Sequence, residues 1–471
     1  MSNKHSYLAK NVVLFAIGNF APKILTFILV PLYTSCLSTE EYGISDLIST
    51  TVQLLLPIFT LDIQDAVLRF SLDEDFDKKE VFSSSMKIVL NGALIVTAAS
   101  ILLSVLKIPG VSNVYLMFFV LMYITHALYN SIVLFCRGVD CVSVVMGSSI
   151  INSIVALSAN ILFLVVFEWG LIGYLLANTI GSILALVWCF FGAKLYRYIV
   201  FKPSRGVSRL MITFSFPLIF NVLAWWINQS LDRYILSWMV GVSVSGIYAV
   251  SYKIPSLISI CQSVFAQAWS ISAVKEFDKD DSDGFVSDMY TLMNGGMAVV
   301  CSFVMIINIP LAKLLYSNNF FEAWQYAPPL MLSVVANAMS LFIGSIFTAV
   351  KDTKTIAVST VVGAIINLVC NFIFIYYWSA YGAALATLLG YAVTLAMRHI
   401  LLCKHIRLRI NWYRDIAVYA LLVLQMIIAN GGVSAMLPQL GVFAVIMLLY
   451  IKEIKQALIF VKGKFFRKKA Q

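Results

Sequence analysis

Long apolar stretches separated by short polar segments are the dominant pattern of this chain. A helix needs about 20 mostly apolar residues to cross the hydrocarbon core of a bilayer, and about fourteen stretches of the 471-residue sequence reach that length. They lie at 12–36, 44–70, 84–106, 114–136, 143–166, 171–193, 211–240, 246–270, 286–308, 326–350, 355–377, 382–403, 415–436 and 440–460. The pattern predicts an all-α polytopic membrane protein with about 14 transmembrane helices. The first stretch has no small-residue cleavage site, so we expect a retained span and not a cleaved signal peptide.

The positions of Lys and Arg predict how the spans are oriented. With a cytoplasmic N-terminus, the outside connections carry only Lys107 and Lys313, whereas the inside ones hold nearly all other cations. Cytoplasmic loops are enriched in Lys and Arg, so both termini of this multi-pass protein are expected to be cytoplasmic. The net charge of +10 does not indicate nucleic-acid binding, because the chain has no polar, basic domain.

Composition and loop length exclude most enzyme classes. The chain is 61% hydrophobic and 12% charged, whereas soluble domains are about 25% charged. The longest connections, 71–83, 194–210, 274–285 and 309–325, are too short to fold as extramembrane domains. No P-loop, HExxH or GxSxG motif occurs, and neither His nor Cys has metal-ligand spacing. We therefore expect no enzyme activity, no cofactor and no metal site, and any energy source must be an ion gradient, the membrane potential or substrate supply.

A weak internal repeat relates the two halves of the chain. NILFLVVFEWGLIGYLLANTIGS begins at Asn160 and NFIFIYYWSAYGAALATLLGY at Asn371. Their glycines correspond, and so, roughly, do four prolines; these pairs are Gly173 with Gly382, Gly181 with Gly390, Pro22 with Pro217, and Pro57 with Pro255. The offset is about two hundred residues, or six spans, so both halves run in the same direction. Parallel repeats of this kind build two bundles around a central cavity.

The repeat predicts three parts of the chain. Residues 1–200 and 201–410 would form two six-helix lobes, and residues 411–471 would form two additional helices and a basic cytoplasmic tail. The alternative is that apolar helices resemble one another by composition alone.

Cations inside the predicted spans are the first candidates for function, because a charge at mid-bilayer costs roughly 2.5–3.5 kcal/mol. Lys23 follows Pro22 in the first span and is expected to line a cavity, or else to pair with an acid on a neighbouring helix. Arg233 and Lys253 flank one short hairpin, each roughly 10 Å from the outer surface at 1.5 Å per residue. Snorkelling toward the headgroups is the alternative for both.

Acidic residues inside the spans form a second set of candidates. Asp62, Asp65 and Arg69 follow at i, i+3 and i+7, so a continuous helix would place them on one face. Asp65 and Arg69 have the spacing of an intrahelical salt bridge, which leaves Asp62 as a possible coupling group. Asp232 is adjacent to Arg233 but points about 100° away on a helix, so the two side chains are not expected to pair directly.

Two segments resemble bacterial polysaccharide-export flippases. One is LSTEEYGISDL from Leu37, and the other is FSFPLIFNVLAWWINQSLDRYILSWMVGVSVSGIYAVSYKI from Phe214. The chain is similar over nearly its whole length to the Wzx-type O-antigen and capsule repeat-unit flippases, a group related to multidrug exporters and the lipid II flippase.

The resemblance implies alternating access between two six-helix lobes and an undecaprenyl-diphosphate-linked oligosaccharide as substrate. It also implies cationic cavity residues, which Lys23, Arg233 and Lys253 match in type and region, and a proton or cation gradient. Partners would be the bilayer and the polysaccharide polymerase and chain-length machinery. The alternative is a cation-coupled multidrug or metabolite exporter of the same fold. A polymerase or ligase is disfavoured because the outer loops hold almost no Arg or His.

Overall fold

The computed structural model describes residues 27–107, 112–275, 278, 281–406 and 408–453. Within these ranges the chain is helical and contains no strand. It divides into two compact units, Met1–Trp226 and Ile227–Gln471, and the division falls inside helix α9. Lys23 and Pro22 lie outside the described residues. The expected division at residues 200 and 410 stays a prediction.

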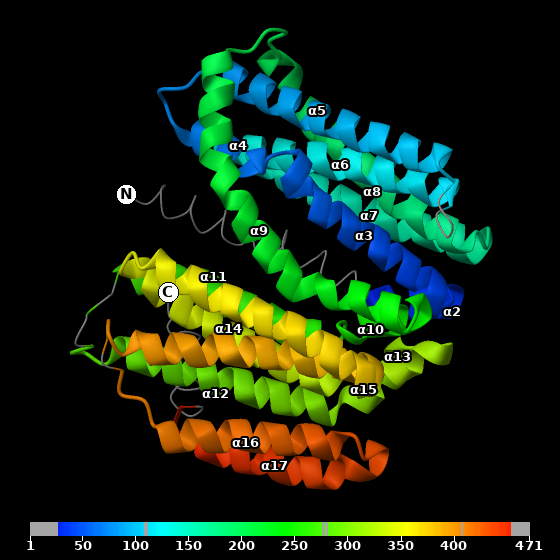
Figure 1. Cartoon of the computed structure of the whole chain (residues 1–471). Helices are drawn as coiled ribbons and strands as arrows, with labels where there is room; N and C mark the ends of the chain where they lie inside the picture. Colours follow the sequence, from blue (N-terminus) through cyan, green and yellow to red (C-terminus); the bar gives the residue numbers. More distant parts are fainter. Residues whose placement is uncertain (1–26, 108–111, 276–277, 279–280, 407, 454–471) are drawn as a thin grey trace, which may run out of the picture. The chain divides into compact units, whose positions relative to one another are not determined.

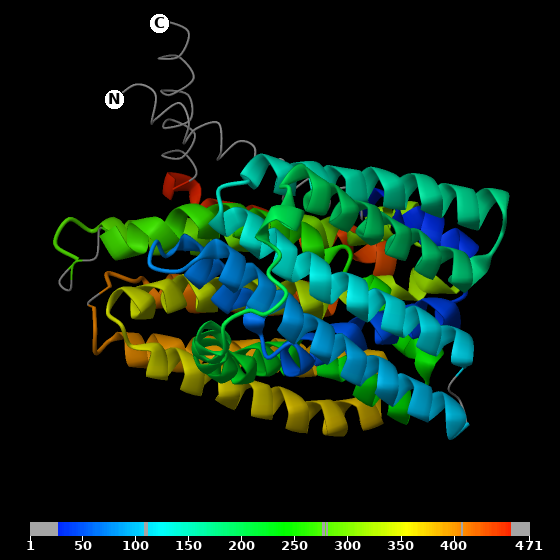
Figure 2. The same ribbon diagram turned by 90° about the horizontal axis from the view of Figure 1, so that it is seen from above.

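The first unit is a bundle of long helices (Figures 1 and 2), in which α5, α6, α7 and α8 run side by side. Its helices are α2 (Val30–Cys36), α3 (Thr39–Phe59), α4 (Ile63–Leu72), α5 (Lys78–Val105), α6 (Asn113–Gly138), α7 (Val142–Asn160) with the π-helical η1 (Ile161–Val166), α8 (Gly170–Gly192), the 3-10 turn η2 (Leu195–Tyr198) and the first part of α9 (Arg205–Met239). The core of this bundle is apolar and includes Val67, Tyr123 and Phe135, none of which is exposed.

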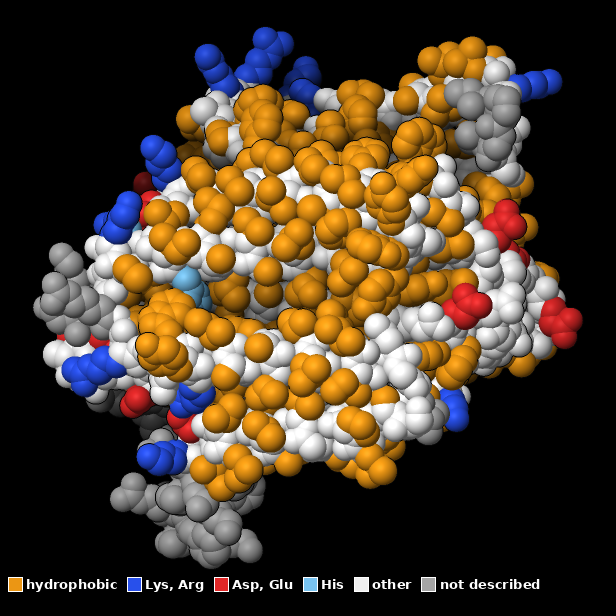
Figure 3. All heavy atoms as spheres, turned by 60° about the horizontal axis from the view of Figure 1, so that its bottom comes forward, with side chains coloured by type: hydrophobic (Ala, Val, Ile, Leu, Met, Phe, Trp, Pro, Cys, Tyr) orange, Lys and Arg blue, Asp and Glu red, His pale blue; other side chains and the backbone are white. Residues whose placement is uncertain are grey.

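The second unit is also helical, with α16 and α17 packed beside α12 (Figure 1). After the end of α9 it contains α10 (Val242–Ser251), α11 (Pro255–Lys275), α12 (Phe285–Ile306), α13 (Asn308–Leu315), the 3-10 helix η3 (Asn318–Gln325), α14 (Ala327–Ala349), α15 (Thr353–Leu402), α16 (Trp412–Ala429), the 3-10 turn η4 (Gly432–Ala435) and α17 (Met436–Leu449). Figure 3 shows a surface covered by hydrophobic side chains, with Lys and Arg gathered toward its edges. Ile416 on α16 and Leu437 and Leu448 on α17 are exposed apolar side chains, which suits contact with lipid.

The described helices confirm a polytopic membrane protein, but not the count of fourteen spans. Ten helices are long and apolar enough to cross a bilayer, or eleven when α10 and α11, bent by 46°, count as one span. Most of the first expected span lies outside the described residues, and α17 has only 14 residues. The number fourteen therefore stays a prediction.

Helix α15 is a hairpin in which the predicted spans 355–377 and 382–403 fold back on each other. Its 50 residues include one non-helical position, Ser379, with φ 51° and ψ −133°. The hairpin is shown by hydrogen bonds between its halves, among them Arg398 Nε to Ser359 Oγ at 3.0 Å. Near the inner ends expected for these spans, His405 lies 3.1 Å from Asp352, the N-cap of α15. Hydrogen bonds from Thr355, and then the contact with His405, hold the pKa of the Asp352 carboxyl below its usual value.

The second predicted span, 44–70, is not one continuous helix. Helix α3 ends at Phe59 and α4 begins at Ile63, because Leu61 and Asp62 both take left-handed backbone conformations. Such a break exposes backbone groups that lipid cannot satisfy. Here the hydroxyl of Ser215 donates to the Leu61 carbonyl at 2.7 Å.

The break between α10 and α11 is stabilised in a similar way. Pro255 begins α11 after the non-helical residues 252–254, and the hydroxyl of Tyr316 donates to the carbonyl of Val250 at 3.2 Å. Ile254 is fully buried, so this irregular backbone is enclosed by protein.

The glycines of the repeat allow close helix packing in each unit. A Cβ on Gly382 would lie 2.0 Å from the carbonyl oxygen of Phe374, and one on Gly173 would lie 3.1 Å from that of Phe163. Corresponding glycines thus sit against backbone in corresponding hairpins, as small residues do where membrane helices cross closely.

We predict that Gly382→Ala destabilises the protein by about 1–3 kcal/mol, the usual cost of overpacking a closed core. Gly296→Ala is the matched control, because a Cβ on Gly296 meets nothing within 4 Å and Ala favours a helix over Gly by about 1 kcal/mol. Thermal unfolding in detergent, followed by tryptophan fluorescence, should show a lowered midpoint for Gly382→Ala only. Equal midpoints for both variants would contradict the packing argument.

Candidate functional site

A buried carboxylate, Asp232 on α9, is the centre of the first candidate site. It is 1% exposed, and its Oδ2 accepts hydrogen bonds from the hydroxyls of Tyr248 at 2.6 Å and Tyr252 at 3.0 Å. Thr387 of α15 donates to the same oxygen at 3.3 Å, while Oδ1 accepts the backbone N–H of Arg233 at 2.9 Å. We call Asp232, Tyr248, Tyr252 and Thr387 the Asp232 cluster.

Local sequence explains why the two tyrosines converge on Asp232. Gly241, with φ 136°, turns the chain after α9 so that α10 can run back beside it. Residues four apart share a helix face, and Tyr248 and Tyr252 are so spaced, with ring centroids 5.4 Å apart. The Ser245 hydroxyl donates to the carbonyl of Arg233 at 3.1 Å and holds the start of α10 against α9.

The hydrogen bonds continue from the Asp232 cluster into the first half of α15. Asn367 Nδ2 approaches Thr387 Oγ1 at 3.5 Å, and Asn371 Nδ2 donates to Asn367 Oδ1 at 3.0 Å. Both asparagines are buried, and Asn371 Oδ1 has no hydrogen-bond partner among the described residues. The network therefore offers several oxygen atoms around one carboxylate, the ligand type that hard cations prefer.

The sequence-predicted cations occupy different surroundings. The Arg233 guanidinium lies over the Tyr252 ring, 5.1 Å from its centroid, so it adjoins the Asp232 cluster. A cation over an aromatic face is attracted by the ring quadrupole. Lys253 is half-buried in the break between α10 and α11, and no hydrogen bond or ion pair joins its side chain to another described residue. Lys23 cannot be placed.

The acidic residues of the second span are not arranged as predicted. Asp62 is fully buried in the break before α4 and accepts a hydrogen bond from Gln64 at 3.0 Å, whereas Asp65 is exposed. Arg69 pairs with Asp73 at 3.3 Å and not with Asp65. The expectation of one shared face was wrong because it assumed a continuous helix through a position where the backbone is left-handed.

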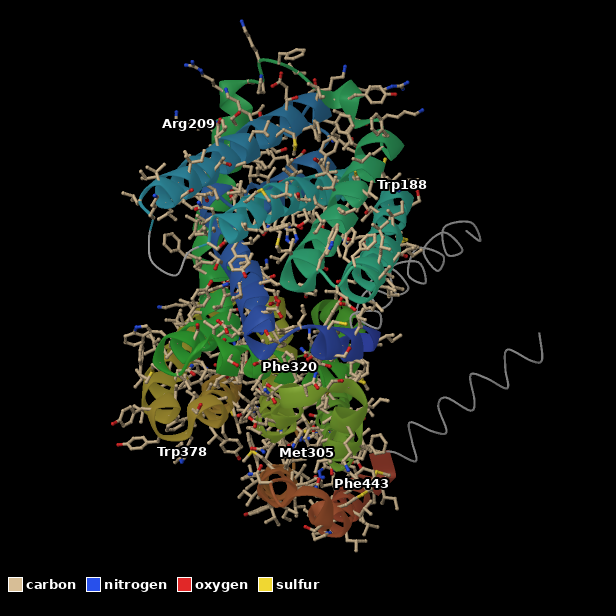
Figure 4. All side chains as sticks on the ribbon, turned by 90° about the vertical axis from the view of Figure 1, so that its right-hand side faces the viewer. Trp188, Arg209, Met305, Phe320, Trp378 and Phe443 are labelled. Atoms are coloured by element: carbon tan, nitrogen blue, oxygen red, sulfur yellow. The ribbon has the colours of Figure 1, made fainter. Side chains whose placement is uncertain are left out.

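An apolar groove in the second unit was not predicted. It has a volume of about 980 Å³ and is lined by α12, α14, both halves of α15, and α16. Its lining includes Leu332, Phe374, Trp378, Leu385, Leu388, Leu389, Ala392, Leu395, Ala396, Ile400, Ile416 and Leu422. Trp378, labelled in Figure 4, is on the first half of α15.

The groove is about as long as the hydrocarbon core is thick. Leu385 and Cys403 both line it, and the 18 residues between them correspond to about 27 Å of helix, against about 30 Å for the bilayer interior. Toward the Cys403 end the residues that line it include Tyr290, His399 and Asp415. The Tyr290 hydroxyl is hydrogen-bonded to His399 Nε2 at 2.8 Å.

Comparisons with known proteins establish the family. The family described as polysaccharide biosynthesis protein matches residues 8–271, more than half of the chain. The chain belongs to the polysaccharide biosynthesis protein family. This membership confirms, at the level of the family, the resemblance to polysaccharide exporters noted in the sequence. Among curated proteins none matches.

Solved structures of the lipid II flippase MurJ and of MATE family transporters share the fold of this chain. The lipid II flippase MurJ in an inward closed conformation has a TM-score of 0.71 at 15% identity, with 95% of this chain and 100% of that chain covered. An inward-facing multidrug resistance MATE family transporter of the MOP superfamily has a TM-score of 0.65 at 14% identity, covering 86% and 99%. A MOP superfamily transporter from Pyrococcus furiosus, with a binding pocket described as reversed in polarity, has a TM-score of 0.56 at 13% identity, covering 87% and 96%.

We predict that Asp232→Ala lowers the free energy of unfolding of this protein by about 1–3 kcal/mol, because the substitution removes the acceptor of three buried or half-buried hydroxyl groups. Asp288→Ala is the control, since Asp288 is exposed in the first turn of α12. Thermal unfolding in detergent should separate the two variants. An unchanged midpoint for Asp232→Ala would show that the hydrogen bonds around Asp232 contribute little to stability.

Proposed function

We propose that this protein is a flippase for an undecaprenyl-diphosphate-linked oligosaccharide, which it turns from the cytoplasmic to the periplasmic leaflet of the inner membrane by alternating access. The observation that carries the proposal is the apolar groove of the second unit. Its lining and its length of about 27 Å suit one extended isoprenoid chain. A groove for a small drug would not need to run through nearly the whole hydrocarbon depth.

The cations support the diphosphate part of the proposed substrate. Arg233 is an arginine at membrane depth, and a planar guanidinium binds phosphate oxygens through two parallel hydrogen bonds. Its guanidinium lies over the ring of Tyr252, a member of the Asp232 cluster, 5.1 Å from the ring centroid. Lys23 and Lys253 are proposed as further cations of the same kind.

The Asp232 cluster supports coupling to an ion gradient. Three hydroxyl groups converge on the carboxylate of α9, and they come from α10, the residue that follows it and the second half of α15. The amide of Asn367 connects the first half of α15 to this cluster through Thr387. A small cation or proton bound there would favour the arrangement that holds these helices together. After the cation or proton is released, only the hydroxyl donors would stabilise the carboxylate. The occupancy of the ion site and the arrangement of the helices would therefore be linked.

A cation-coupled drug or metabolite exporter is the second candidate. The fold shared with MATE family transporters and the buried Asp232 favour it. It predicts that deletion makes cells sensitive to organic cations and leaves surface polysaccharide intact.

Deletion of the gene tests the proposed function directly. In a strain without a redundant flippase, we expect lipid-linked oligosaccharide units to accumulate on the cytoplasmic leaflet and surface polysaccharide to be lost, because the units are not carried across. The measurement is the leaflet distribution of the units together with the surface polysaccharide. Normal surface polysaccharide in a strain without a redundant flippase would overturn the proposal.

Two substitutions test the two ends of the proposed substrate in a complemented deletion strain. Arg233→Ala should reduce export about tenfold or more through loss of charge-assisted hydrogen bonds, and Ala392→Trp should reduce it by filling the groove. The measurement is export rate at equal amounts of folded protein in the membrane.

Each substitution has a matched control. Arg209→Ala changes an exposed arginine at the other end of α9 (Figure 4), and Ala420→Trp places the same bulk on an exposed position of α16 that does not line the groove. Both controls should export normally. Normal export by Arg233→Ala and Ala392→Trp would remove the assigned roles of the cation and the groove.

A further inference from the structure

A second pocket lies in the first unit and shares no lining residue with the apolar groove. Its volume is about 570 Å³, and its walls come from α5, α6, α8 and the segment 199–203 that follows η2. We call it the α5 pocket; it is lined by Phe82, Ser83, Met86, Lys87, Leu90, Asn91, Leu128, Ile132, Leu186, Phe190, Ile199, Val200, Phe201 and Pro203. Small-molecule sites have volumes of about 300–1,000 Å³.

The segment that closes the pocket is held in place by hydrogen bonds to α5. The Ser83 hydroxyl donates to the carbonyl of Tyr198 at 3.0 Å and accepts the N–H of Val200 at 2.7 Å. Glu80 accepts the N–H of Ser204 at 2.5 Å. The wall is therefore built before any ligand arrives, which lowers the entropy cost of binding.

The pocket opens on a surface that suits bilayer lipid. Leu90, Leu94 and Ile95 on α5 are 50%, 68% and 54% exposed, and Phe201 is 97% exposed. Exposed apolar side chains in a membrane-spanning helix face hydrocarbon, and a protruding Phe beside Lys202 is typical of a membrane interface. Lipids of the surrounding leaflet can therefore reach the pocket.

The polar groups of the pocket are suited to a phosphate. Lys87 lies about 13 Å along α5 from Lys78, at 1.5 Å per residue, and no hydrogen bond or ion pair joins its side chain to another described residue. Asn91 follows one turn later and lines the same pocket, whereas no carboxylate lines it. Exposed Lys202 adds a second cation next to Phe201.

We propose that the α5 pocket binds one anionic glycerophospholipid of the surrounding bilayer. Lys87, with Asn91 and Lys202, holds the phosphate, and one acyl chain lies against Leu90, Leu128 and the apolar wall of α8. A net negative headgroup is favoured because basic pockets at membrane interfaces attract anionic lipids. The site is separate from the proposed function and does not depend on it.

Lipid binding to the full-length protein tests this site without any transport assay. Native mass spectrometry in detergent measures binding of phosphatidylglycerol, with phosphatidylcholine as the zwitterionic probe and undecaprenyl phosphate as the carrier-lipid probe. Lys87→Gln should weaken phosphatidylglycerol binding about fivefold, the value of one interfacial cation. Leu90→Trp, which fills the pocket at a half-exposed position, should also weaken it.

Lys79→Gln is the matched control, because Lys79 is exposed on the same helix but does not line the pocket; it should bind phosphatidylglycerol like the unaltered protein. Unfolding midpoints of all variants exclude loss of fold as the cause. The proposal is overturned if Lys79→Gln weakens binding as much as Lys87→Gln, since attraction would then be general to the surface. It is also overturned if phosphatidylcholine binds as well as phosphatidylglycerol, or if Lys87→Gln affects undecaprenyl phosphate more than phosphatidylglycerol.

Discussion

A carboxylate buried among membrane helices must find its hydrogen-bond donors within the protein, because lipid supplies none. In the second unit this requirement is met at Asp232. Its donors come from Tyr248 and Tyr252 in and just after α10 and from Thr387 in the second half of α15. The first half of α15 joins the network through Asn367. The carboxylate of Asp232 thus connects four helical segments through hydrogen bonds. Any event that neutralises this carboxylate changes the hydrogen bonds that hold all four segments together.

The sequence predicted the membrane class and most of the spans, because both depend on how many apolar residues follow one another. It did not predict where the helices break. The left-handed pair at Leu61 and Asp62 and the turn at Ser379 occur at residues other than Gly, the residue that adopts positive φ most readily. The carbonyl of Leu61 accepts a hydrogen bond from Ser215, which is far along the chain, and a pattern of neighbouring residues does not show such a partner. Side-chain pairing within the second span was therefore also mispredicted.

At the candidate site, too, the sequence indicated single residues but not the contacts between residues that are far apart in the chain. Arg233 and Asp232 stood out from the sequence because charges are rare in apolar spans. The donors to Asp232 did not, since hydroxyls within spans are common and only the fold shows which of them converge. The apolar groove could not be predicted at all. Its walls consist of ordinary Leu and Ala positions, and only the packing of α12, α14, α15 and α16 leaves a space between them.

The two broken spans carry a consequence for how the helices can move. One break is at residues 60–62 and the other at 252–254, close to the repeat offset of about two hundred residues, and each lies near a proline, Pro57 or Pro255. At or next to each break a hydroxyl from a distant part of the chain donates to a backbone carbonyl, Ser215 to that of Leu61 and Tyr316 to that of Val250. A bend at these points breaks fewer backbone hydrogen bonds than a bend in the middle of an intact helix, where lipid offers no replacement for the bonds that are lost. The glycine-packed hairpins have no such freedom, because a backbone contact as close as that at Gly382 leaves no room to slide. If the protein works by the proposed alternating access, we expect bending at the spans that are already broken, while the glycine-packed hairpins move as rigid units.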